Sequence, residues 1–263
     1  MDREHGSPQR GRGAVGVPDG DVEAAGGVGS AVGAARAAVA GRGWYLMDAA
    51  ATSRCLGAGP AAWEQLAGHW EDLVADPYAA EQGTSRLRRI GRFLLSRSGE
   101  ISPLPHETFV QPQASNPLYV DVERRFEPLT AAFRGEPVLG ALIRTLGEVA
   151  AGLDDSGQWI VRVHPFRVLA QTGSLGQPTP EGRHKDGVTL VSSLLIGRRN
   201  VTGGRSTVYD AEGAEIASAT LSEPGSLLLS DDRATWHAVS PLQPRDPARP
   251  GHRDVLVTTL AAP

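Results

Sequence analysis

The sequence predicts an α+β protein with a mainly helical N-terminal half and a C-terminal half made mainly of β-strands. Two observations support this fold class. Before Gly157, apolar residues recur every three or four positions in several segments, as they do in amphipathic helices. After Gly157, short runs rich in Val, Leu and Thr alternate with Gly, Pro, Asn and Asp, which indicates five or more strands and favours a sandwich or barrel.

The chain has 263 residues, which is long enough for one sizeable hydrophobic core. Residues 1–25 are polar, rich in Gly and Pro and without periodicity, so we expect a disordered N-terminal tail there. No linker separates the two halves. We therefore expect residues 26–263 to form a single domain, with a helical part over 26–157 and a β core over roughly 158–263.

Composition and charge exclude several classes of protein. The net charge is −4 and the arginines are scattered among acidic residues, so no basic surface for nucleic acid is expected. No apolar run approaches the length of a membrane span, and no signal peptide is visible. The single cysteine, Cys55, can form no internal disulfide. We expect a soluble cytoplasmic protein without a nucleic-acid or membrane partner.

Three helices are predicted in the N-terminal half, over residues 26–41, 59–76 and 136–153. The second has four apolar residues on one face: Trp63, Leu66, Trp70 and Leu73. His69 lies beside that face, and we expect a structural or exposed histidine rather than a ligand. The glycines before the first helix do not form the G-x-G-x-x-G fingerprint, which argues against a dinucleotide site.

The rest of the N-terminal half gives weaker signals. Residues 43–49 resemble a short strand that follows the first helix. Residues 80–135 are rich in arginine and irregular. A strand near residues 109–112 and a turn at 115–119 are the elements that we expect within them.

The C-terminal half contains six runs with high β-propensity. They cover residues 158–171, 188–196, 205–221, 225–232, 235–242 and 253–261. Within the third run, the stretch DAEGAE at residues 210–215 predicts a hairpin turn.

A candidate metal site begins at His184 and Asp186. Residues two apart in an extended segment point to the same side, so both side chains can reach one ion while Lys185 points away. Alone, the pair is equally compatible with a charged surface loop. His237 lies at the start of a later strand, and two histidines with one carboxylate are the ligand set of non-haem Fe(II) oxygenases. Such a set leaves positions open for a co-substrate and O2.

Arg253 opens the last predicted strand. A buried arginine there is a natural partner for the distal carboxylate of a co-substrate, because a guanidinium binds a carboxylate through two parallel hydrogen bonds. The absence of thiolate ligands argues against a structural zinc site.

These residues resemble the Fe(II)/2-oxoglutarate-dependent dioxygenases, whose pattern is H-x-D, a distant H, and R on the eighth core strand. More narrowly, PTPEGRHKDG, RRNVTGGRSTVYD, LSEPGSLLLSDDRATWHAVSPL and GHRDVLVTTL are similar to the bacterial family typified by L-isoleucine dioxygenase, which hydroxylates free amino acids. The resemblance covers residues 158–263 well. RLRRIGRF and QPQASNPLYVDVERRFEPL extend it more thinly over 85–130.

The resemblance implies a double-stranded β-helix, or jelly roll, with the N-terminal helices packed on it. It also implies Fe(II), 2-oxoglutarate and O2, and hydroxylation of an aliphatic carbon of a free amino acid or a similar small metabolite, with decarboxylation of 2-oxoglutarate to succinate. His184, Asp186 and His237 would bind iron, and Arg253 would hold the 5-carboxylate of 2-oxoglutarate. Related halogenases have Gly or Ala where Asp186 stands, so the aspartate favours hydroxylation.

The substrate residues implied by the resemblance are Arg167 and Glu181. Arg167 would meet a substrate carboxylate or else pair with Glu181, and Glu181 would meet a substrate amine or else brace the loop. Asn116 and Tyr119 are possible walls of the pocket.

Several nearby residues are assigned supporting roles. Asp231 and Asp232 would orient His237 or form a turn. Trp236 is expected to point towards the core, and Arg162 and His164 are expected to be structural. A further turn between core strands is predicted at residues 200–204, where glycines suit the backbone geometry.

Two rival functions stay open. A metal-binding cupin that uses no 2-oxoglutarate would share the histidines and the aspartate, with Arg253 structural. A non-catalytic β-sandwich that binds a sugar or a protein would carry these residues by accident. A nucleophilic hydrolase is disfavoured, because the chain lacks a G-x-S-x-G elbow.

Overall fold

The computed structural model describes residues 28–81, 83–108 and 123–263. Four sequence-based predictions lie outside these residues: the tail over 1–25, the strand near 109–112, the turn at 115–119, and the pocket walls Asn116 and Tyr119. Among the residues that are described, no helix is long and apolar enough to cross a membrane.

The helices of the described chain precede residue 151. Their bounds are α1 (Val28–Arg42), α2 (Ala49–Leu56), α3 (Pro60–Gly68), the 3₁₀ helix η1 (His69–Asp72), α4 (Pro77–Glu81), α5 (Ala131–Arg134) and α6 (Pro137–Ala150). The strands are β1 (Trp44–Met47), β2 (Val74–Ala75), β3 (Arg86–Arg88), β4 (Gly91–Ser96), β5 (Ile101–Pro103), β6 (Gln158–Ala170), β7 (Leu190–Arg199), β8 (Val201–Gly203), β9 (Arg205–Tyr209), β10 (Glu215–Thr220), β11 (Leu227–Asp231), β12 (Trp236–Val239), β13 (Leu242–Pro244) and β14 (Gly251–Ala261).

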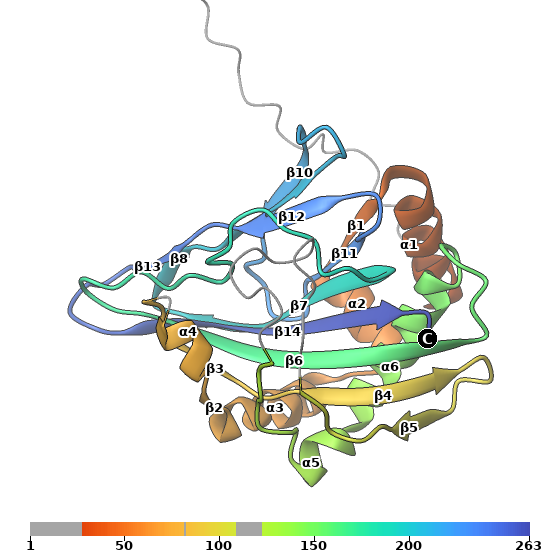
Figure 1. Cartoon of the computed structure of the whole chain (residues 1–263), viewed down its shortest axis with the longest axis horizontal. Coiled ribbons are helices and arrows are strands. Elements are labelled where there is room, and N and C mark those ends of the chain that lie inside the picture. Colours follow the sequence, from red (N-terminus) through yellow and green to blue (C-terminus); the bar gives the residue numbers. More distant parts are fainter. Residues whose placement is uncertain (1–27, 82, 109–122) are drawn as a thin grey trace, which may run out of the picture.

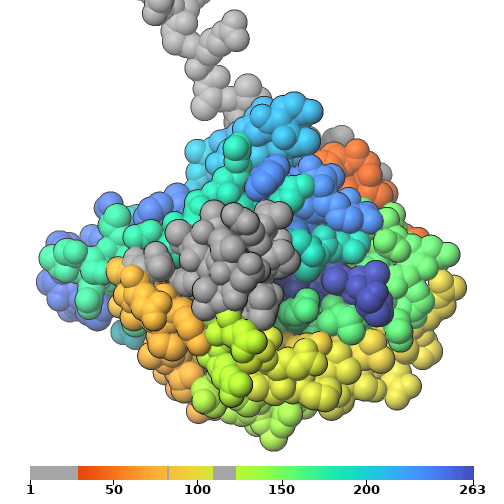
Figure 2. Space-filling view, in the orientation of Figure 1, coloured from red at the N-terminus to blue at the C-terminus, as the bar shows by residue number. Residues whose placement is uncertain are grey.

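The strands form one large and two small antiparallel sheets. The large sheet has nine strands in the order β1-β11-β7-β14-β6-β3-β2, with β4 and β5 attached beside β6. A three-stranded sheet, β10-β9-β12, lies above it, and β13 pairs with β8 (Figure 1). In the space-filling view, the blue small sheet lies in the upper part of the molecule and the yellow β4 and β5 lie at its lower right (Figure 2).

The core lies between the large sheet and the helices. Side chains of α1, α3 and α6 pack against alternate residues of the central strands, such as Val161 and Val163 on β6 and Leu256 and Leu260 on β14. The residues between them point to the opposite face of the sheet, because successive side chains of a strand alternate. That opposite face carries the candidate site.

The predicted helices are confirmed with one change of length. The helix expected over 59–76 ends at Gly68 and continues as η1 to Asp72. Its predicted apolar face is confirmed, since Leu66 and Trp70 are fully buried. Glycine is a poor helix former, and Trp70 donates its indole N–H to the carbonyl oxygen of Phe166 at 3.0 Å, which holds η1 against β6.

The description of residues 26–157 as a helical part needs correction. Strands β1 to β5 lie in this range and belong to the same large sheet as β6, β7 and β14. β1 confirms the strand predicted over residues 43–49. β3 was missed because its inward positions carry the cations Arg86 and Arg88, so it lacks the apolar alternation of a strand. β4 keeps that alternation, with Phe93 and Leu95 buried.

The C-terminal strands follow the sequence prediction closely, including the hairpin turn at 210–215, whereas the turn predicted at 200–204 contains the short strand β8. Asp210 and Gly213 close the hairpin between β9 and β10, and Gly213 has a φ of 88°. Within residues 200–204, Asn200 and Gly203 have positive φ values of 50° and 77°, a conformation that few side chains tolerate.

Candidate active site

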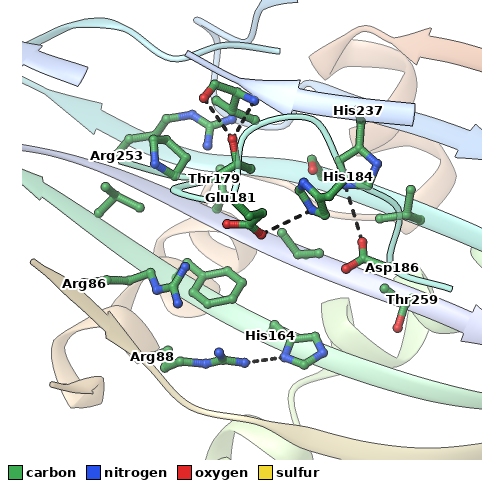
Figure 3. A pocket seen from close by; sticks show the side chains of 18 of the residues that line it. Arg86, Arg88, His164, Thr179, Glu181, His184, Asp186, His237, Arg253 and Thr259 are labelled. Atoms are coloured by element: carbon green, nitrogen blue, oxygen red, sulfur yellow. Dashed lines mark hydrogen bonds and ion pairs between the residues drawn. The ribbon is translucent and has the colours of Figure 1, made fainter. Parts of the chain in front are cut away.

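The structure brings His184, Asp186 and His237 together between the small sheet and the large one. One ligand atom from each lies within 4.8 Å of the others. His184 and Asp186 belong to the loop before β7, and His237 belongs to β12 (Figure 3). The loop is paired with β12 at this point, because the backbone N–H of each histidine donates to the carbonyl oxygen of the other at 3.0 Å.

Hydrogen bonding orients the His184 imidazole. Its Nδ1 lies 3.0 Å from the carbonyl oxygen of Gly182. A carbonyl can only accept, so Nδ1 carries the proton and Nε2 keeps its lone pair. His237 places its Nε2 3.5 Å from Oδ2 of Asp186. Two imidazole nitrogens and one carboxylate oxygen therefore converge, which is a donor set suited to Fe(II).

Burial has opposite effects on these acidic and basic groups. It raises the pKa of Asp186, and it lowers the pKa of His237, which the nearby His184 lowers further. Both directions follow from the cost of burying a charge. A neutral His237 is the form that binds a metal, and a divalent cation would favour the ionised form of Asp186. The electrostatics of Asp186 and His237 therefore fit a bound metal ion.

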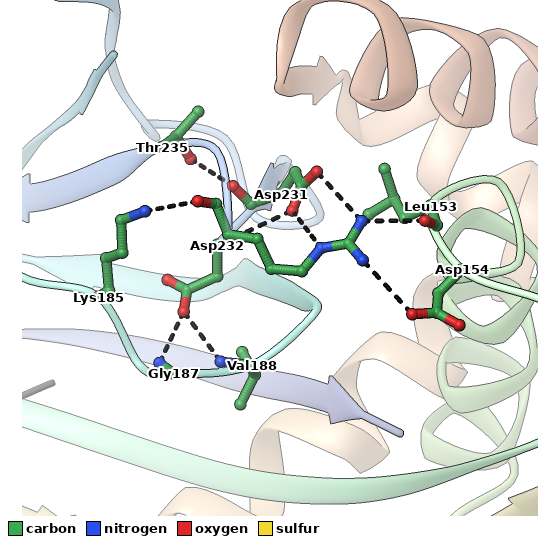
Figure 4. Close-up of polar contacts among 9 residues, drawn as sticks. Leu153, Asp154, Lys185, Gly187, Val188, Asp231, Asp232 and Thr235 are labelled. Carbon is green, nitrogen blue, oxygen red and sulfur yellow. Dashed lines mark hydrogen bonds and ion pairs between the residues drawn. The ribbon is translucent and has the colours of Figure 1, made fainter. Parts of the chain in front are cut away.

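Asp232 connects the two parts of the ligand set. Its fully buried carboxylate accepts the backbone N–H of Asp186 at 3.1 Å. It also accepts those of Gly187 at 2.7 Å and Val188 at 3.0 Å (Figure 4). Its Oδ1 also lies 3.7 Å from Nδ1 of His237. The turn role is therefore confirmed for Asp232. Its carboxylate lies behind the His237 imidazole beyond hydrogen-bond distance, so an orienting role for it stays a prediction.

The neighbouring Asp231 has a different role. Its Oδ1 accepts the backbone N–H of Arg233 at 3.1 Å and the Nε of Arg233 at 3.2 Å. These contacts brace the turn between β11 and β12 and do not reach the ligands. Lys185 points away from the cavity, as predicted, and donates to the carbonyl oxygen of Arg233 at 2.6 Å.

Asp232→Asn is expected to weaken metal binding by about 10- to 100-fold, because an amide offers one acceptor oxygen where three backbone donors need a carboxylate. The dissociation constant from an anaerobic Fe(II) titration measures this effect, with circular dichroism as a check on folding. Asp231→Asn is the matched control, and we expect its affinity to stay within about 3-fold of the wild type. Equal affinities for Asp232→Asn and the wild type would contradict a positioning role.

A cavity of about 120 Å³ opens beside the ligands. The large sheet forms one wall, through alternate residues of β6 and β14: His164, Phe166 and Val168, and Arg253, Val255 and Val257. The loop that carries His184 and Asp186 forms the opposite wall. The sheet wall is largely apolar in its middle and cationic at its margins.

Arg253 is the cation that lies on β14. It is 3% exposed, and its Nε and Nη2 have no hydrogen-bond partner among the described residues. Its pKa is lowered to about 10, mainly by burial and to a smaller extent by the nearby charge of Arg198. A buried guanidinium with unused donors is a fit for a carboxylate. Because the same cavity reaches Arg253 and the three ligands, one small dicarboxylate can contact both.

Gly204 leaves room for the Arg253 side chain. Its φ is +69°, and a Cβ there would lie 2.7 Å from Cδ2 of Leu242 and 3.2 Å from Cδ of Arg253. The prediction that these glycines serve the backbone is confirmed, and Gly204 also permits a close approach to Arg253.

Glu181 and Arg167, the two expected substrate residues, lie in different places. Glu181 lines the cavity, with its Oε1 3.6 Å from Nε2 of His184 (Figure 3). Arg167 lies on the opposite face of β6, where it donates two hydrogen bonds of 2.8 Å to Asp254 and one of 2.9 Å to Glu71. The expectation that Arg167 meets the substrate is therefore corrected: strand alternation turns it towards the helices.

Sequence reasoning missed other cavity residues. His164 is 6% exposed and lines the cavity, although a structural role was expected for it. Arg86, Arg88 and Arg124 also line it. The R-x-R spacing in RLRR was the available signal, since it places two arginines on one face of a strand.

Trp236 also differs from its prediction. It is half-buried rather than part of the core, and the Nζ of Lys185 lies 5.3 Å from its ring centroid. The ring therefore covers the outer side of β12, where lysine and arginine side chains pack on it.

Comparison with known proteins gives matches over most of the chain. The sequence model of the family described as 2OG-Fe dioxygenase matches residues 67–259. The 3(1)-hydroxy-L-isoleucine 4-dioxygenase of Pantoea ananatis (strain AJ13355) is 23% identical over 202 residues, which cover 75% of this chain and 80% of that protein.

Solved structures share the fold. A bsmA homolog from Methylobium petroleophilum PM1 superposes with a TM-score of 0.81 and 35% identity, over 92% of this chain and 96% of that one. IDO from Bacillus thuringiensis superposes with a TM-score of 0.72 and 17% identity, over 93% of this chain and 99% of that one.

Proposed function

The chain belongs to the family of 2OG-Fe dioxygenases, and from this premise we propose that it hydroxylates an aliphatic carbon of a free amino acid. The enzyme class and the co-substrates follow from the family: the protein is a 2-oxoglutarate-dependent dioxygenase that uses Fe(II), 2-oxoglutarate and O2. The rival readings, a cupin without 2-oxoglutarate and a non-catalytic β-sandwich, are set aside by this membership.

The observation that carries the proposal is one cavity with three kinds of site. It holds the ligand set His184, Asp186 and His237, the buried cation Arg253, and the carboxylate of Glu181. We assign iron to the ligand set and the 5-carboxylate of 2-oxoglutarate to Arg253. When bound, the iron supplies the activation of O2 that is coupled to decarboxylation of 2-oxoglutarate to succinate.

The protein contributes binding, orientation and exclusion of water. Glu181 is proposed to bind the substrate ammonium group, because among the described residues it is the carboxylate that lines the cavity without being part of the ligand set. Phe166, Val255 and Val257 give the cavity an apolar wall, which limits water around the reacting carbon. The relative named 3(1)-hydroxy-L-isoleucine 4-dioxygenase adds support for an amino-acid substrate.

Three further assignments accompany this function. We assign the two facing sheets to a double-stranded β-helix, with the helices packed on the large sheet. Residues 26–263 are proposed to act as a single catalytic domain. A cytoplasmic location is proposed because the chain has one cysteine and therefore no structural disulfide.

The direct test combines the anaerobically purified protein, Fe(II) and 2-oxoglutarate with each of the proteinogenic amino acids and then admits O2. We expect at least one amino acid to stimulate succinate formation and to give a product with one added oxygen atom by mass spectrometry. Slow succinate formation that no amino acid stimulates would contradict the amino-acid substrate, while leaving the enzyme class intact.

A further inference from the structure

The cavity has a second cationic margin that co-substrate binding does not use. Strand β3 directs Arg86 and Arg88 into it, and the two side chains are 9% and 4% exposed. Arg86 is opposite Val168 of β6, and Val168 is in turn opposite Arg253 of β14. Arg86 and Arg253 therefore stand in one row two strands apart, with roughly 10 Å between their backbones. The sheet wall thus presents two separate cationic positions.

Arg86 is anchored from behind the cavity. Its Nε and Nη2 donate to Oδ2 of Asp76 at 3.0 and 2.7 Å. Asp76 is fully buried and also accepts backbone N–H groups of Tyr78 and Ala79 at 3.1 and 3.2 Å. Asp76 does not line the cavity. The same Oδ2 of Asp76 lies 3.8 Å from Nη1 of Arg88, so one buried carboxylate holds both guanidinium groups in place. Two arginines and one aspartate leave one net positive charge on this side of the cavity.

Aromatic rings fix the orientation of Arg88. Its Cζ lies 3.6 Å from the centroid of the Phe126 ring and 4.6 Å from that of Phe166. A guanidinium stacked on a ring directs its N–H donors outward in its own plane, where they can meet a planar carboxylate. The Nη2 of Arg88 also contacts Nδ1 of His164 at 2.7 Å (Figure 3).

His164 contributes an acceptor but no charge. Burial lowers its pKa well below the usual value, and the neighbouring arginines lower it further. The acidic residues that line the cavity in the described part of the chain are Glu181 and Asp186, both on the opposite, loop wall. Charge is therefore separated across the cavity, with guanidinium groups on the β3 side and carboxylates on the loop side.

We propose that Arg86 and Arg88 form a subsite for the carboxylate of the substrate, distinct from the site of 2-oxoglutarate at Arg253. The inference rests on the proposed function. An amino acid bound in this way spans the cavity, with its carboxylate at β3 and its ammonium group at Glu181. Substrate binding should then be weakened equally by removal of the carboxylate charge from the substrate and by removal of a guanidinium group from the protein.

A binding experiment tests the subsite without turnover. The full chain is saturated with Fe(II) and 2-oxoglutarate under anaerobic conditions, so that Arg253 is occupied, and its Tm is followed as isovalerate or the uncharged isovaleramide is added. We expect isovalerate to raise the Tm of the wild type and isovaleramide to leave it unchanged. Arg88→Met is expected to lose the response to isovalerate. Equal responses to the two probes, or a retained response in Arg88→Met, would overturn the subsite.

Two further variants guard against a trivial loss of folding. Arg88→Lys keeps the charge but lacks the planar fork, and we expect its affinity for isovalerate to fall by at least about 10-fold. Arg167→Met removes a half-buried arginine from the helix face of β6, and its response to isovalerate should persist although its Tm is lower. Loss of the response in Arg167→Met to the same extent as in Arg88→Met would assign the effect to stability and overturn the proposal.

Kinetics separate the subsite from the proposed function. With an amino acid that the wild type oxidises, Arg88→Met should raise the KM for that amino acid by at least about 30-fold, but the KM for its amide by less than about 3-fold. Binding of isovalerate without oxidation of any amino acid would support the subsite and refute the amino-acid substrate. If Arg88→Met oxidised amino acids with an unchanged KM, the result would support the amino-acid substrate and refute the subsite.

Discussion

His237→Ala is expected to lower substrate-dependent succinate formation by at least about 10³-fold and to weaken Fe(II) binding by at least about 100-fold. The variant removes one of the three converging ligand atoms and leaves only those of His184 and Asp186. The backbone pairing of residue 237 with His184 does not depend on the side chain, so the fold should persist.

An anaerobic Fe(II) titration and a succinate assay measure the two effects of His237→Ala. The matched control is Lys185→Ala, because Lys185 lies between two proposed ligands but points to the outer surface. We expect its iron affinity to remain within about 3-fold of the wild type. If His237→Ala bound Fe(II) as tightly as Lys185→Ala, the assignment of His237 as a ligand would be wrong.

Arg253→Met is expected to raise the KM for 2-oxoglutarate by at least about 100-fold, because two charge-assisted hydrogen bonds to its 5-carboxylate are lost. The same change should raise the free energy of unfolding of the ligand-free protein by about 1–3 kcal/mol, because an apolar side chain of similar volume replaces a buried cation. The unused Nε and Nη2 of Arg253 are the physical reason for this gain.

The opposite signs of these two effects make Arg253→Met a sharp test. Urea denaturation gives the stability, and the rise of Tm with added 2-oxoglutarate gives the binding. Arg167→Met is the mirror control: it breaks a pair with the buried Asp254, so we expect a loss of about 3 kcal/mol with unchanged binding of 2-oxoglutarate. A stability loss in Arg253→Met together with intact binding would identify Arg253 as structural instead.

The sequence alone was sufficient for the local features of the site. His184 and Asp186 share a side because an extended chain alternates, and this relation needs no knowledge of neighbouring strands. His237 and Arg253 could be found because each lies near the start of a strand with strong β-propensity. The C-terminal strands, the helices α1 and α6 and the hairpin turn could be predicted for the same reason, since periodicity and turn residues are local signals.

Only the tertiary structure decided which arginines face the cavity. Arg167 and His164 lie on one strand, but they are an odd number of positions apart, so their side chains point to opposite faces of the sheet. The sequence does not say which of these faces is the core. Strand β3 could not be recognised from the sequence, because its inward positions are occupied by the buried cations Arg86 and Arg88 instead of apolar residues. The role of Asp232 required the loop of Asp186 to fold back on the turn before β12. These relations join segments far apart in sequence, and packing alone brings them together.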